Sequence, residues 1–160
     1  MTVSVQAEDF DPGAEMAALS RAGHEIGAVT TFVGLVRDMT DHGRLTAMTL
    51  EHYPGMTDRK LEEIRQEAFH RWPDLRAVRI IHRYGRLTPG ERIVFVATAS
   101  PHRDVAFDAC RFLIDWLKTS APFWKLEEAD GQARWVEAKT SDTQAAKRWD
   151  GFKKMDPTGA

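Results

Sequence analysis

Two lysines flank an aromatic segment in the second half of this chain, and cations placed in this way could hold an anion. Residues 118–125 are KTSAPFWK, so that Lys118 and Lys125 lie on either side of a Pro-Phe-Trp run. Lys118 also stands where a helix over the preceding apolar stretch should end, and a cation there complements the helix dipole. Lys125 falls in a strand-like stretch and could equally be a solvent-exposed strand residue. The spacing leaves both interpretations open: two surface cations, or two cations at the edge of one pocket.

A second basic group lies at the start of the same helix. In the segment SPHRD we expect Ser100 to be the N-cap and Pro101 the first helical residue. His102 and Arg103 would then occupy a first turn whose unpaired N–H groups already favour anions. Such a turn suits a phosphate or a carboxylate, although two side chains in water explain the pattern equally well. Arg37, at the end of a strand, is by itself more typical of a surface residue.

Composition argues against several other kinds of chemistry. The 160 residues contain 22 Lys and Arg against 24 Asp and Glu, which predicts no general affinity for nucleic acid. The six histidines form no helical pair and no Cys/His ligand spacing, so we expect neither a metal site nor a cofactor. The single cysteine, Cys110, falls on an apolar helical row and is expected to be a buried packing group. With no bilayer-length apolar run and no signal-like N-terminus, we expect a cytoplasmic location and no membrane partner.

The pattern of apolar residues predicts one α+β domain. Stretches rich in β-branched residues indicate strands over residues 2–7, 24–36, 45–53, 76–85 and 91–100, and a closing hairpin over 123–139. Helical spacing indicates about three helices, over residues 11–22, 57–72 and 101–117. Residues 37–44 and 86–90 are predicted to form a loop and a turn. We assign residues 1–140 to the folded domain and 141–160 to a partly mobile C-terminal tail.

Several longer segments resemble one family. The segments FVGLVRD, LEHYPGMT, IHRYGRLTPGE, SPHRDVAF and DWLKTSAPFWKLE are similar, in this order, to the large catalytic subunit of molybdopterin synthase. The resemblance extends from about Gly27 to Asp142. It implies an α/β hammerhead-type single domain with a mixed β-sheet. It also implies a central homodimer in which each subunit binds a small ubiquitin-like sulfur-carrier protein, giving a heterotetramer.

The resemblance also implies a reaction and the residues that perform it. Two sulfurs pass from the C-terminal Gly-Gly thiocarboxylate of the carrier to cyclic pyranopterin monophosphate, producing the dithiolene of molybdopterin. By resemblance, Lys118 is the principal catalytic lysine and Lys125 its partner. The other implied substrate-binding residues are Leu35, Val36, Arg37, His102, Arg103, Leu126 and Glu127. Family members often carry a basic residue at the position of Leu126, so that only a backbone contact is carried over there.

The implied chemistry accounts for the unusual cations. A phosphate ester and a thiocarboxylate are both anions, and each requires cationic partners. We expect three other cations to crowd Lys118 and to disfavour its charged form, which suits a proton carrier near neutral pH: Arg37, Arg103 and Lys125.

Two other functions fit parts of the same pattern. A non-catalytic module that docks a ubiquitin-like carrier tail would leave sulfur transfer intact when Lys118 is replaced. A phosphate-ester hydrolase could use the same anion site, but the sequence offers neither a visible nucleophile nor a set of metal ligands for it. We therefore predict a sulfurtransferase.

Overall fold

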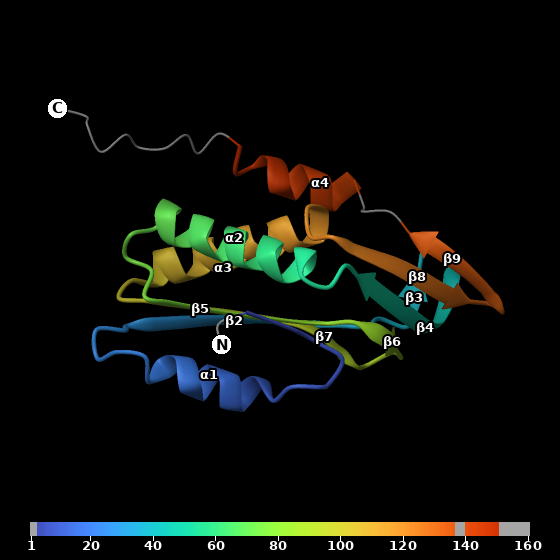
Figure 1. Cartoon of the computed structure of the whole chain (residues 1–160), viewed down its shortest axis with the longest axis horizontal. Coiled ribbons are helices and arrows are strands. Elements are labelled where there is room, and N and C mark those ends of the chain that lie inside the picture. Colours follow the sequence, from blue (N-terminus) through green and yellow to red (C-terminus); the bar gives the residue numbers. More distant parts are fainter. Residues whose placement is uncertain (1–2, 137–139, 151–160) are drawn as a thin grey trace.

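The structure is a computed structural model that describes residues 3–136 and 140–150. Within these ranges the chain forms two β-sheets and four helices (Figure 1). The first sheet has the strand order β1 (Val3–Gln6), β5 (Ala77–Arg83), β7 (Arg92–Ser100) and β2 (Ala28–Leu35). β1 runs parallel to β5, whereas β5 and β2 run antiparallel to β7. The predicted α+β domain with a mixed sheet is confirmed.

The second sheet contains the predicted closing hairpin. Its strands are β3 (Met39–Thr40), β4 (Gly43–His52), β8 (Phe123–Ala129) and β9 (Gln132–Val136), and β6 (Gly85–Leu87) also pairs with β4. Residues 137–139, which the predicted hairpin includes, lie outside the described residues. The sequence predicts a loop and a turn where β3 and β6 form. Both strands are too short to show alternation. β3 pairs with the start of β4 across a tight turn, whereas β6 pairs with residues of β4 that are distant in sequence.

Helices cover both faces of the first sheet (Figure 1). α1 (Pro12–Ser20) lies on one face and begins as predicted, with Asp11 Oδ1 accepting the N–H groups of Gly13 and Ala14. α2 (Met56–Arg71) and α3 (Arg103–Thr119) lie on the other face, and α4 (Thr140–Lys147) packs against α3. None of the helices in the described ranges is long and apolar enough to cross a membrane.

α3 begins later than the sequence predicts, because Ser100 is the last residue of β7 and not an N-cap. The Ser100 carbonyl accepts the N–H of Gly27 at 3.0 Å, next to the pairing of β2 with β7, so Ser100 continues the strand and the helix opens further along the chain. His102 is the N-cap instead, and its carbonyl accepts the N–H of Ala106 at 3.3 Å. The hydroxyl of Ser100 still supports the turn by accepting the N–H of His102 at 3.2 Å.

The main core lies between the first sheet and the two long helices. The buried residues of α2 and α3 include Leu61, Ile64, Ala68, Ala109, Phe112 and Leu113, which recur at helical spacing within two of the predicted helices. Each large apolar side chain removed from water contributes about 1.5–3 kcal/mol before entropy is counted. This packing holds α3 firmly on the sheet, and therefore determines where both of its ends lie.

A smaller core joins the two sheets. Its buried members are Val36, Leu45, Met48, Leu50 and Leu87. The chain passes from β5 into β6 through Tyr84 and Gly85, and Gly85 has a φ of 95°. Residues with a side chain rarely adopt this conformation, so glycine allows the abrupt change of sheet. The two sheets thus meet immediately after the end of β5.

The C-terminal segment contributes to the main core as far as Trp149. The sequence-based division places residues 141–160 in a tail, whereas α4 packs on α3 and Trp149 is only 7% exposed. The Trp149 indole donates to Asp115 Oδ2 at 2.8 Å, and its ring meets those of Trp72 and Phe112 edge-on. The rest of the predicted tail, residues 151–160, lies outside the described residues.

Candidate active site

Lys118 lies in the last turn of α3, where its side chain is exposed. The helix ends immediately beyond it, since the N–H of Ser120 bonds to the carbonyl of Trp116 at 2.8 Å. The positive charge of Lys118 is close enough to the His82 imidazole to lower its pKa. Lys118 therefore lies at the end of the helix, near the junction of the two sheets.

Lys125 is the third residue of β8 and pairs with Leu50 of β4. Its Nζ lies 3.3 Å from Oε1 of Glu127, which follows two residues later on the same face of the strand. The two side chains are 32% and 10% exposed, so the ion pair is partly shielded from water. A substrate anion at Lys125 must therefore compete with the Glu127 carboxylate.

A stacked pair of rings connects the surroundings of the two lysines. The His82 imidazole of β5 lies flat on the Phe123 ring of β8, with centroids 3.8 Å apart and planes at 18°. His82 is buried, and its Nδ1–H donates to the carbonyl of Arg83 at 2.9 Å. Burial lowers the pKa of His82 to about 4, helped by the charges of Lys118 and His52 and opposed by the bond to Arg83. His82 is consequently neutral at pH 7.

Leu35 is the last residue of β2, and Val36 and Arg37 follow it, at the same end of the first sheet as His82. Both Leu35 and His82 pair with residues near the start of β7. The Val36 N–H donates to the carbonyl of Glu91 at 2.9 Å, and Val36 itself is 4% exposed. Leu35 and Arg37 are exposed. The structure therefore anchors this segment through Val36 and leaves the Arg37 side chain available.

His102 and Arg103 lie at the opposite end of α3 from Lys118. Fifteen residues separate Arg103 from Lys118, which corresponds to about 22 Å along a helix. The Arg103 side chain is 84% exposed, with Asp104 Oδ1 at 4.0 Å from its Nε. Within one chain Arg103 therefore does not crowd Lys118, contrary to the sequence-based expectation. The sequence does not reveal this, because Arg103 and Lys118 are close in the chain but lie near opposite ends of a straight helix.

Leu126 points away from the candidate site. It is in register with Thr49 and Trp135, on the opposite face of β8 from Lys125 and Glu127. This geometry agrees with the expectation that no side-chain role is carried over to Leu126.

Cys110 is a packing group, as predicted. It is 4% exposed, and its apolar surroundings raise the pKa of its thiol to about 12. Because the chain has only this cysteine, it offers no thiolate nucleophile at neutral pH.

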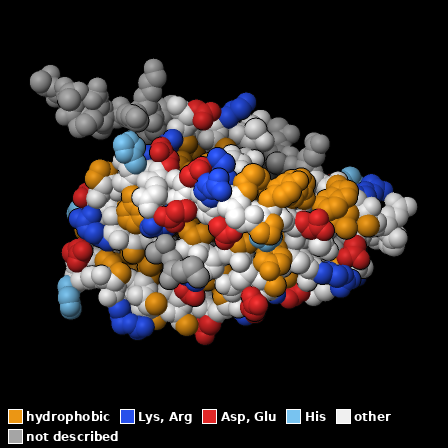
Figure 2. Space-filling view, viewed as in Figure 1, with side chains coloured by type: hydrophobic (Ala, Val, Ile, Leu, Met, Phe, Trp, Pro, Cys, Tyr) orange, Lys and Arg blue, Asp and Glu red, His pale blue; other side chains and the backbone are white. Residues whose placement is uncertain are grey.

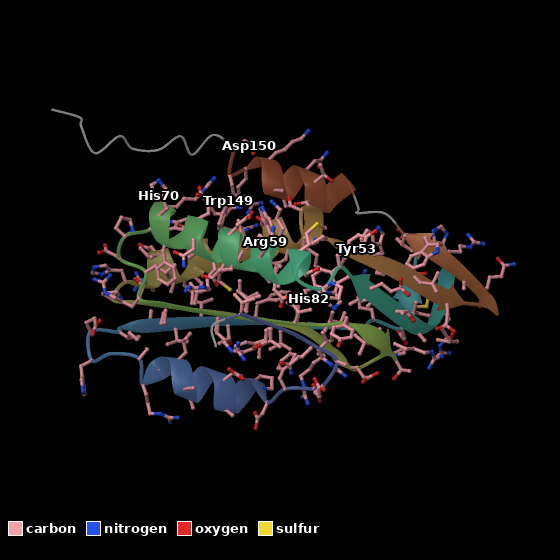
Figure 3. The ribbon with its side chains drawn as sticks, in the orientation of Figure 1. Tyr53, Arg59, His70, His82, Trp149 and Asp150 are labelled. Carbon is pink, nitrogen blue, oxygen red and sulfur yellow. The ribbon has the colours of Figure 1, made fainter. Side chains whose placement is uncertain are left out.

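His82 and Phe123 are the site residues that the sequence-based reasoning missed. Both fall inside segments already noted, IHRYGRLTPGE and KTSAPFWK, but no spacing rule connects them. Figure 3 shows His82 in the interior, between the first sheet and α2, whereas Arg59 and His70 lie along α2. A shallow groove over those α2 residues contains neither lysine, and its lining includes ion-paired surface side chains such as Glu62 and Glu63.

These features define an α+β protein whose candidate site is built from lysines, with a buried neutral imidazole beneath them and no thiol. Residues 5–120 match the family model described as MoaE protein, and the chain belongs to this family.

Similar proteins extend over nearly the whole chain. A molybdopterin synthase catalytic subunit of Pseudomonas aeruginosa is 55% identical over 150 residues, which cover 94% of this chain and 99% of that protein. The solved structure of the molybdopterin biosynthesis MoaE protein of Burkholderia ambifaria is 50% identical, with a TM-score of 0.80 over 93% of this chain and 97% of that one. A subunit in the complex of subunits 1 and 2 of the molybdopterin-converting factor of Helicobacter pylori shares the fold. It has a TM-score of 0.71 at 17% identity, over 87% of this chain and 92% of that one.

Proposed function

We propose that this chain is the catalytic subunit of a molybdopterin synthase, a sulfurtransferase of molybdenum cofactor biosynthesis. The observation that carries the proposal is the placement of Lys118 and Lys125 on two successive elements, α3 and β8, beside the stack of Phe123 on His82 at the sheet junction. The relative from Pseudomonas aeruginosa, matched over 99% of its length, supports the same activity.

The chemistry assigns a different task to each lysine. Lys118 would orient the carrier's thiocarboxylate and would carry protons as sulfur adds to cyclic pyranopterin monophosphate and the cyclic phosphate opens. Lys125 and Arg37 would hold the phosphate of the pterin. Since Lys125 is paired with Glu127 in this structure, the phosphate would replace that carboxylate when it binds.

The position of Arg103 calls for a second copy of the chain. Residues 103, 107, 114 and 118 recur at helical spacing on one side of α3. Phe112, which contacts Trp72 at the end of α2, lies about 140° around the helix from Phe107. This side of α3 therefore faces away from α2 and towards β2. Phe107 is 59% exposed there.

We propose that two copies of the chain associate along this edge. β2 is the last strand of the first sheet among the described residues, and its Phe32 is 36% exposed. A two-fold axis between two β2 strands would make the two α3 helices antiparallel. The His102–Arg103 pair of one copy would then approach Lys118 of the other, completing a cationic pocket that one chain leaves open.

The carrier subunit needs a docking surface of its own. Figure 2 shows hydrophobic side chains gathered over the start of α2 and the neighbouring strands. Tyr53, Met56 and Trp124 are 55%, 42% and 42% exposed, and the rings of Tyr53 and Trp124 meet edge-on at 4.4 Å. Trp124 is the neighbour of Lys125 in β8. We propose that the body of the small carrier subunit covers this surface.

The test is molybdopterin formation from cyclic pyranopterin monophosphate and a thiocarboxylated carrier. Lys118→Ala should reduce the transfer rate by about 100- to 10,000-fold, the range typical of a lost proton-transfer group. Lys60→Ala is the matched control, because Lys60 is an exposed lysine of α2 paired only with Glu63 among the described contacts.

Two outcomes would contradict parts of this proposal. Equal product from the wild type and Lys118→Ala would remove Lys118 from the chemistry. Tight carrier binding without any product from the wild type would favour a non-catalytic module that docks the carrier tail.

A further inference from the structure

Lys118 and Lys125 belong to different layers of the molecule. Lys118 is carried by α3, which packs on the first sheet, whereas Lys125 is carried by β8 of the second sheet. The separation of the two ammonium groups therefore depends on how firmly the two layers are held together. A reaction that uses both groups on one substrate is sensitive to this separation, because a misplacement of about 1 Å can cost about 100-fold in rate.

The stack of His82 on Phe123 is a direct contact between these layers. His82 follows Val78 and Ile80 at strand spacing, on the face of the first sheet that packs against α2 and α3. Phe123 begins β8, and Lys125 follows two residues later on the same face. The stack therefore lies on the side of the first sheet that is covered by α3, which carries Lys118, and on the same face of β8 as Lys125.

The His82 ring has little freedom to move. It is 8% exposed, and its Nδ1–H is held by the carbonyl of Arg83 at 2.9 Å. The Arg83 side chain is fixed in turn, since its Nε and Nη1 donate to the carbonyls of Ala7 and Arg92 at 3.0 and 2.9 Å. One partner of the stack is thus tied to three strands of the first sheet or their ends.

A second imidazole supports the other ring. His52 pairs with Phe123 across β4 and β8, and their ring centroids are 6.1 Å apart. The Thr57 hydroxyl donates to the carbonyl of Tyr53 at 2.9 Å, so the 3.3 Å contact between His52 Nδ1 and Thr57 Oγ1 makes His52 the donor. Both imidazoles are therefore held by a hydrogen bond at Nδ1.

We propose that His82 is a positioning residue for sulfur transfer: through its stack on Phe123, it sets the separation between Lys118 and Lys125. This inference rests on the proposed function for its kinetic consequence, but its geometric consequence can be measured separately. A neutral imidazole suits the position, because a charged group there would repel Lys118.

The kinetic test compares His82→Ala with His82→Phe, which keeps a planar ring on Phe123. We expect His82→Ala to lower kcat for sulfur transfer by about 10- to 100-fold with little change in KM for the pterin. His82→Phe should recover most of the rate, and His70→Ala, at an exposed histidine of α2, should match the wild type. A folded His82→Ala variant with the wild-type rate would overturn the proposal, as would a folded His82→Phe variant as slow as His82→Ala.

The geometric test uses a short bifunctional amine reagent and mass spectrometry of the carrier-free protein. We expect a cross-link between Lys118 and Lys125 in the wild type and in His82→Phe, and a several-fold lower yield in His82→Ala. Phe123→Leu removes the other half of the stack and should lower the yield in the same way, which keeps the test decisive if His82→Ala does not fold. An unchanged cross-link yield in a folded variant would refute the positioning role. A wild type that forms the cross-link but no product would instead count against the proposed function.

Discussion

The two ends of α3 are both basic, but only one of them is supported by its own chain. At the C-terminal end, Lys118 stands near a buried imidazole that is stacked on Phe123 and bonded to the backbone. At the N-terminal end, His102 makes no side-chain capping bond and Arg103 projects into water. A supported cation and an unsupported one have different uses: the first can act within the chain, and the second can complete the site of another copy.

The largest expected effect comes from mixing two inactive variants, which tests whether Arg103 serves the site of another copy. Lys118→Ala and Arg103→Ala should each lose most activity, by about 100-fold or more for Lys118. If Arg103 serves the partner's site, half of the randomly mixed dimers would carry one intact site of two, so activity should return to roughly a quarter of wild type. The measurement is the rate of molybdopterin formation before and after subunit exchange. No recovery in dimers shown to have exchanged would place both residues in one chain's site, or Arg103 outside it.

The buried imidazole at the supported end makes the stability of the fold depend on pH. Because the pKa of His82 falls from 6.5 to about 4 on folding, only the unfolded chain binds a proton between these values. The stabilising contribution is complete above pH 6.5 and is lost as the pH falls towards 4, on the order of 3 kcal/mol in total. Urea unfolding of wild type and His82→Phe at pH 7.5 and 4.5 measures it, and His102→Phe is the matched control. Equal pH dependence in wild type and His82→Phe would mean that the pKa of His82 is the same in the folded and unfolded states.

Substitutions on the proposed carrier surface and on the proposed dimer edge should have different effects, so that docking can be tested separately from chemistry. Trp124→Ala should weaken carrier binding by about 10- to 30-fold, because exposed aromatic residues often dominate an interface. Phe107→Ala, at the proposed edge between two copies, should leave carrier affinity unchanged and instead weaken dimerisation. Calorimetric titration of the carrier and analytical ultracentrifugation measure the two effects. The assignment of the two surfaces would be reversed by the opposite pattern.

The smallest expected effect concerns the partly shielded ion pair. Glu127→Gln removes the carboxylate that holds Lys125 at 3.3 Å, so the pterin phosphate no longer has to compete for that lysine. We expect KM for the pterin to fall a few-fold with kcat nearly unchanged, in keeping with the modest energy of such pairs. Steady-state kinetics at low ionic strength checks this, with Glu128→Gln as the neighbouring control. A rise in KM would indicate that Glu127 itself helps to bind the substrate.

The long elements of the fold are predictable from the sequence, and the short ones are not. The rows around Leu61 and Phe112 predict α2 and α3 because helix burial imposes a regular period. β3 and β6 show no such pattern, since they have only two and three residues, and β6 forms by pairing with a strand distant in sequence. The predicted start of α3 is also two residues too early. The competing bond from Gly27 to Ser100 becomes visible only when the strands are side by side.

The candidate site, too, is only partly predictable from the sequence. Resemblance to a family singles out Lys118 and Lys125, but it does not tell whether Arg103 can reach them. The helix answers this for a single chain, because its rigid rise separates Arg103 from Lys118 by about 22 Å. Nor does any spacing bring His82 to Phe123, since the two residues are 41 positions apart and lie on different sheets.

Local periodicity and side-chain chemistry predict the α+β class, the helical spacing of the core residues, the inert Cys110 and the cations. These properties belong to each residue wherever it lies. Which cations share a surface, which side of α3 remains open and which histidine stays neutral all depend on how the elements pack. The physical reason is that proximity and burial are properties of the packed layers, and packing depends on contacts between residues far apart in the chain.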